Sequence, residues 1–75
     1  MSEGTAGRVV RVSVNGTPRE VAVATTLDVL VASFTAAASG VAAAVNETVV
    51  PRGSWRDTPL GEGDRVEVLT AVQGG

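Results

Sequence analysis

The dipeptide Asn15-Gly16 restricts the fold most, because it lies directly after a run of alternating apolar and polar residues. Both residue types tolerate positive φ, so Asn-Gly beside alternating segments is the strongest short-range signal for a β-hairpin. Residues 9–14 therefore form the first strand of a predicted hairpin, with successive side chains on opposite faces. Its inward side chains are predicted to be Val10, Val12 and Val14, with Arg11 and Ser13 on the other face.

The second strand of this hairpin is expected to begin just after Pro18. Proline has no N–H to donate to a strand ladder, so Thr17 and Pro18 are predicted to lengthen the turn. Residues 19–24 then make the strand, with Val21 and Val23 pointing inward.

A single helix is predicted next. Thr25 and Asp28 have the spacing of a capping box, and Thr26 is an alternative cap that moves the boundary by one residue. The alanines at 36–38 continue the helix weakly, and residues 39–40, Ser-Gly, end it. One apolar stripe at helical spacing, assigned to the core, consists of Leu27, Leu30, Val31 and Phe34.

The second half of the chain is predicted to hold three more strands. The small apolar run 41–45, flanked by Gly and Asn, favours a buried strand. The elements expected after it are a turn at 46–48, a short strand at 49–51, a compact loop or helical turn at 52–55, a turn at 61–64 and a strand at 65–71. Val66 and Val68 share one face of this last strand, opposite Glu67 and Leu69. The order β-β-α-β-β-β predicts a two-layer α+β domain.

Composition excludes several kinds of site. The chain has 75 residues with neither cysteine nor histidine, so it lacks disulfides, the usual general base and the usual metal ligands. Its six basic residues are dispersed and the net charge is −2, unlike the clustered basic surface of a nucleic-acid-binding protein. Neither a signal peptide nor an apolar run of membrane-spanning length is present, so a cytoplasmic protein without membrane partners is expected. Residues 1–7 are predicted to be a flexible extension, 8–71 the domain and 72–75 a flexible tail.

The sequence ends in Gly74-Gly75, directly after the last predicted strand. Glycine has no Cβ, so an extended Gly-Gly can thread a channel too narrow for other residue pairs. The backbone carboxylate at the end of such a stem can be delivered to the active site of a partner enzyme.

The chain resembles the ThiS family, the ubiquitin-like sulfur carriers of thiazole synthesis. The resemblance rests on residues 44–52, Ala-Val-Asn-Glu-Thr-Val-Val-Pro-Arg, with Trp55 just after them, on residues 63–69, Gly-Asp-Arg-Val-Glu-Val-Leu, and on the terminal Gly-Gly. It implies a β-grasp fold, with a mixed sheet of four to five strands packed on one main helix.

The resemblance also implies a chemistry. An E1-like, ThiF-type partner would adenylate the carboxylate of Gly75 with ATP, and a sulfur donor such as a cysteine desulfurase would supply the sulfur of a thiocarboxylate. A ThiG-type thiazole synthase would then receive that sulfur. On this interpretation the chain is a co-substrate rather than an enzyme, binds no cofactor or metal, and is monomeric when free. The tail that enters partner active sites would be Val72, Gln73, Gly74 and Gly75.

Three side chains outside the tail were assigned from the pattern. Val49 and Leu69 are candidates for partner docking, although either side chain could instead belong to the core. Trp55 is expected to close one end of the core, with its ring N–H hydrogen-bonded.

Other functions remain open at the level of sequence. The small subunit of molybdopterin synthase would use the same tail with a different sulfur acceptor. A protein modifier would join its carboxylate to lysines of target proteins, and a regulatory or RNA-binding β-grasp module would use its surface alone. The fold does not separate these functions.

Overall fold

The computed structural model describes residues 8–35 and 40–70. The predictions for residues 1–7, for the alanines at 36–38 and for the tail at 72–75 therefore lie outside the described residues. The elements are β1 (Val9–Val14), β2 (Thr17–Ala22), α1 (Leu27–Phe34), β3 (Val41–Val45), β4 (Thr48–Val50), the 3₁₀ helix η1 (Arg52–Asp57) and β5 (Arg65–Thr70).

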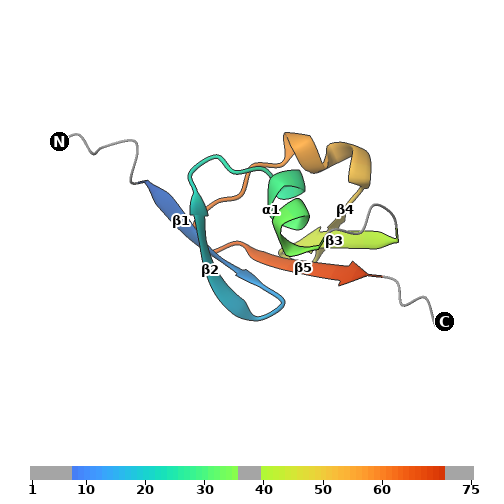
Figure 1. Ribbon diagram of the computed structural model, residues 1–75, viewed down its shortest axis with the longest axis horizontal. Helices are drawn as coiled ribbons and strands as arrows, with labels where there is room; N and C mark the ends of the chain where they lie inside the picture. Colours follow the sequence, from blue (N-terminus) through green and yellow to red (C-terminus); the bar gives the residue numbers. More distant parts are fainter. Residues whose placement is uncertain (1–7, 36–39, 71–75) are drawn as a thin grey trace.

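The five strands form one mixed sheet in the order β2-β1-β5-β3-β4, and α1 lies across one face of it (Figure 1). β5 pairs parallel with β1 and antiparallel with β3. The last strand in the sequence is thus the central strand of the sheet, and it joins the β1–β2 hairpin to the β3–β4 hairpin. This is the predicted β-grasp arrangement of a mixed sheet on one helix.

The first hairpin turns where the sequence predicts, with positive φ at Asn15 (51°) and Gly16 (85°). The predicted start of its second strand is wrong, because β2 begins at Thr17 and includes Pro18, which lies opposite Ser13. β2 is at the edge of the sheet, where a missing N–H removes no ladder bond.

β2 also ends earlier than predicted, at Ala22. Val23 is 47% exposed rather than turned inward, and it precedes Ala24, whose φ of 72° bends the chain toward the helix. Val21 alone of the two predicted valines packs against the core.

The predicted capping box does not form. Thr26, the alternative cap, precedes the first helical residue, and its hydroxyl donates to the carboxylate of Asp28 instead of bonding to a backbone N–H. The helix ends at Phe34, where the backbone of Thr35 becomes extended.

Phe34 is 37% exposed, so its assignment to the core is wrong. It lies in the last turn of α1, and the guanidinium carbon of Arg19 on the edge strand β2 is 5.8 Å from the centre of its ring. The ring of Phe34 is therefore partly in water, with the Arg19 guanidinium over it.

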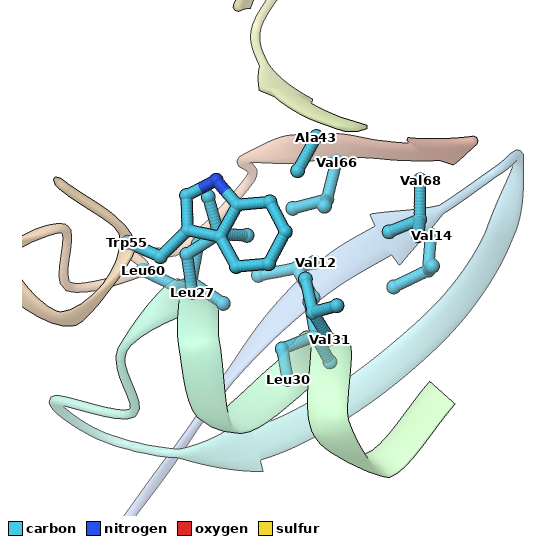
Figure 2. Packing of buried hydrophobic residues seen from close by; sticks show 10 residues of the cluster. All are labelled: Val12, Val14, Leu27, Leu30, Val31, Ala43, Trp55, Leu60, Val66 and Val68. Carbon is cyan, nitrogen blue, oxygen red and sulfur yellow. The ribbon is translucent and has the colours of Figure 1, made fainter. Parts of the chain in front are cut away.

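The core lies between α1 and the sheet (Figure 2). It consists of Val12, Val14, Leu27, Leu30, Val31, Ala43, Trp55, Leu60, Val66 and Val68. Trp55 is 5% exposed, and its Nε1 donates to the carbonyl of Val50 at 2.8 Å, which confirms its predicted role. The predicted burial of the strand at 41–45 holds for one face only, because Ala43 is buried and Ala42 is exposed.

Candidate functional site

The face of the sheet that α1 leaves open carries a small apolar surface. Alternation along β5 buries Val66 and Val68 under the helix and turns Leu69 outward, where it is 67% exposed. Val49 on β4 is 71% exposed. Strand pairing continues this surface, because Ala42 lies opposite Leu69, and Ala44 lies opposite Val49. We call Ala42, Ala44, Val49 and Leu69 the open-face patch.

Small side chains give the open-face patch its shape. Ala42 and Ala44 on β3 are shorter than Leu69 and Val49 on the flanking strands, so the surface dips along β3. The resulting shallow depression has a volume of about 260 Å³, and Glu47 and Glu67 complete its lining. A protruding apolar side chain of another molecule would fit between Leu69 and Val49.

The two glutamates give the patch an acidic border. Glu47 lies 3.6 Å from the guanidinium of Arg65, but both side chains are mostly exposed, so this ion pair is weak. Glu67 has no ion pair within the described residues. The border therefore gives this part of the open face a negative charge.

The patch lies beside the origin of the tail. Leu69 is the penultimate residue of β5, and the last five residues of the sequence follow Thr70 directly. A molecule bound to the patch is consequently close to the end of β5.

Two asparagines hold β5 in place. The side-chain amide of Asn15 donates to the carbonyl of Val68 at 3.1 Å, and its oxygen accepts from the N–H of Val68 at 2.9 Å. In the other hairpin, the oxygen of Asn46 accepts from the N–H of Arg65 at 2.9 Å, while its amide donates to the carboxylate of Asp64 at 3.0 Å. We call the pair of bonds between Asn15 and Val68 the β5 clamp.

Sequence reasoning assigned both asparagines to turns and missed these bonds. The available signal was that each turn places an asparagine, rather than aspartate or a second glycine, at its first position. A carboxamide can donate through its nitrogen and accept through its oxygen at the same time, whereas a carboxylate can only accept.

The remaining predicted site residues divide into two groups. Val49 and Leu69 lie on the same face of the sheet and are exposed, so neither belongs to the core, while their docking role stays a prediction. Val72, Gln73, Gly74 and Gly75 lie outside the described residues.

The described part of the chain shows neither a metal site nor a membrane-spanning helix. Residues 8–35 and 40–70 contain no group of three or more side chains placed to hold a metal ion. Neither helix in those ranges is long and apolar enough to cross a membrane. Arg52 has its guanidinium carbon 5.6 Å from the centre of the Trp55 ring and covers it from outside.

Comparisons with known proteins agree with this architecture. The model of the ThiS family matches residues 12–75. The crystal structure of a thiamine biosynthesis protein (ThiS) from Geobacter metallireducens superposes with a TM-score of 0.72 at 32% sequence identity, covering 88% of this chain and 100% of that one. A comparison with curated proteins gives no match.

Proposed function

Because this chain belongs to the ThiS family, we propose that it is a sulfur carrier of thiamin biosynthesis. The observation that carries the proposal is the extent of the family match, which runs through the β-grasp domain and continues to Gly75. The match thus covers the domain together with Gly74 and Gly75, and the proposal does not rest on the fold alone.

Gly75 is the proposed point of attachment. A carboxylate is a poor electrophile, so an E1-like, ThiF-type partner would first activate it. A carboxylate oxygen attacks the α-phosphorus of ATP and pyrophosphate leaves. The terminal sulfur of a persulfide, formed by a cysteine desulfurase, then attacks the acyl carbon and AMP leaves. A thiol then reduces the resulting acyl disulfide to the thiocarboxylate. This sequence replaces one difficult substitution at the carboxylate by several easier steps.

For these steps the tail must be long enough to reach the active site of a partner enzyme, and small enough to leave space around its terminal carbonyl. Residues 72–75 span at most about 13 Å when fully extended, which carries the terminal carbonyl well beyond the end of β5. Glycine at the last two positions leaves space around that carbonyl for the nucleophile and for AMP. The carrier therefore acts as a protein co-substrate, and ATP is bound by the activating enzyme.

The open-face patch is the proposed docking surface for the partner enzymes, including a ThiG-type thiazole synthase that receives the sulfur. Val49 and Leu69 would lose water-exposed apolar area on docking, which favours association. Glu67 at the border would meet a basic side chain of the partner. Docking there holds the origin of the tail against the partner while the Gly-Gly end enters its active site.

Mass spectrometry of the protein with its natural terminus tests the proposal. We would incubate it with ATP, its activating enzyme and a sulfur source, and analyse the peptide that ends in Gly75. The expected result is the mass increment of an oxygen-to-sulfur exchange on that peptide, absent when ATP is omitted. An unchanged peptide, with an activating enzyme that does form the adenylate, would contradict sulfur carriage.

A further inference from the structure

The turn that carries the β5 clamp is exposed, which favours chemical modification of Asn15, but it also holds the Asn15 side chain in two hydrogen bonds, which opposes modification. Asn15 is exposed and is followed by Gly16, which is exposed as well. A Cβ placed on Gly16 would meet no atom within 4 Å, so this position is open to solvent. Both polar atoms of the Asn15 side chain are nevertheless hydrogen-bonded to Val68.

Asparagine followed by glycine is prone to intramolecular cyclisation, because the glycine nitrogen can approach the carboxamide carbon without steric hindrance. The nitrogen of Gly16 attacks Cγ of Asn15, the C–N bond of the side-chain amide breaks, and ammonia leaves with the proton of the backbone amide. Water then opens the five-membered imide at either carbonyl, which yields aspartate or isoaspartate at position 15.

We propose that Asn15 is a deamidation site that the β5 clamp protects, and that its conversion to a carboxylate releases the end of β5, from Val68 onward, from the first hairpin. The clamp directs the carboxamide toward Val68 on β5, so both of its hydrogen bonds must break before Cγ can turn to the nitrogen of Gly16. Deamidation therefore proceeds from the fraction of molecules in which the β5 clamp is open.

The product cannot restore the clamp. A carboxylate has no hydrogen to donate, so the carbonyl of Val68 loses its partner and faces a negative oxygen instead. β1 pairs with β5 at Ser13–Arg65 and Val14–Val66, and the N–H of Asn15 donates to the carbonyl of Val66 at 2.9 Å. The clamp extends this contact to Val68. Without the clamp, residues 68–70 of β5 are paired only with β3 among the described strands.

The second hairpin supplies a matched control within the same molecule. Asn46 also has a positive φ, 52°, and its side-chain oxygen also accepts from the backbone of β5. It is followed by Glu47, whose side chain hinders closure of the imide ring. Any general effect of solution conditions on asparagine acts on Asn15 and Asn46 alike.

Deamidation would be followed by peptide mapping with trypsin, which places Asn15 in the peptide of residues 12–19 and Asn46 in another. The protein is incubated at mildly alkaline pH, once folded and once in guanidinium chloride. In denaturant, Asn15 should convert much faster than Asn46. In the folded protein its rate should be at least about tenfold lower, because open minor states are populated at roughly 10% or less.

Each alternative result overturns part of the proposal. Equal deamidation rates at Asn15 in folded and unfolded protein would show that the β5 clamp does not protect it. Equal rates at Asn15 and Asn46 in denaturant would show that Asn15 is not a preferred deamidation site. Release of β5 is tested with Asn15→Asp, which still permits the positive φ of the turn. The amides of residues 66–70 should exchange with deuterium faster in this variant than in the wild type, and unchanged exchange would refute release.

Discussion

The indole Nε1 of Trp55 donates a 2.8 Å hydrogen bond to the carbonyl of Val50, which ties the 3₁₀ helix to the end of β4. The same ring closes the core beside Leu27 (Figure 2). One side chain thus satisfies a backbone acceptor at the end of an edge strand and fills the end of the core.

Replacing this side chain separates its two contributions. Trp55→Phe keeps most of the buried ring but leaves the carbonyl of Val50 without its donor, so we expect a loss of about 1–3 kcal/mol in unfolding free energy. Trp55→Ala also loses the packing and should cost about 3–5 kcal/mol. Urea unfolding followed by circular dichroism measures both. A Phe variant as stable as the wild type would show that the hydrogen bond contributes nothing.

The position of Phe34 at the rim of the core makes a second prediction. Leu30→Ala, at a residue that is 2% exposed, should lower the unfolding free energy by about 2–5 kcal/mol. Phe34→Ala should cost at most about 1.5 kcal/mol, because the ring is partly in water and its stacking with Arg19 is worth about 0.5–1 kcal/mol. Equal losses in the two variants would place Phe34 in the core after all.

Docking through the open-face patch predicts a selective loss of binding. Leu69→Ala should weaken binding to the activating enzyme about tenfold, the effect of one central apolar contact of about 1.4 kcal/mol. Its unfolding free energy should change little, since Leu69 is exposed.

Val29 provides the control for Leu69, because it is 56% exposed but lies on the helix. Isothermal titration calorimetry with the activating enzyme would measure both variants, and Val29→Ala should leave the affinity unchanged. Comparable losses in the two variants would mean that docking is not confined to the open face.

The proposed chemistry at the tail predicts that Gly74→Ala and Gly75→Ala impair thiocarboxylate formation without affecting stability. A methyl group narrows the stem and crowds the terminal carbonyl. Single-turnover mass spectrometry would measure the rate, and Gly53→Ala is the control, because a Cβ there meets no atom within 4 Å. Normal rates in the tail variants would contradict the steric role of the glycines.

Patterns confined to neighbouring residues were predictable. The Asn15-Gly16 turn and the inward Val66 and Val68 follow from local conformational preference and strand alternation, and the structure confirms them. The outward orientation of Leu69 follows from the same alternation.

Features that depend on position in the finished sheet were not predictable. A proline ends a central strand but fits an edge strand, and nothing near Pro18 in the sequence says which strand holds it. Phe34 continues the apolar stripe of α1, but it lies at the last residue of the helix, where the side chain is no longer buried against the sheet. The β5 clamp joins residues 53 positions apart, which no local pattern records.

The central position of β5 in the sheet determines how the domain resists a force applied at the end of this strand. A pull applied at Thr70 along the axis of β5 acts on a strand whose hydrogen bonds to β1 and β3 lie across the direction of force. Those bonds are loaded in shear and share the force, whereas an edge strand pulled sideways would open one bond after another. The sheet can therefore resist traction on its last residues without unravelling.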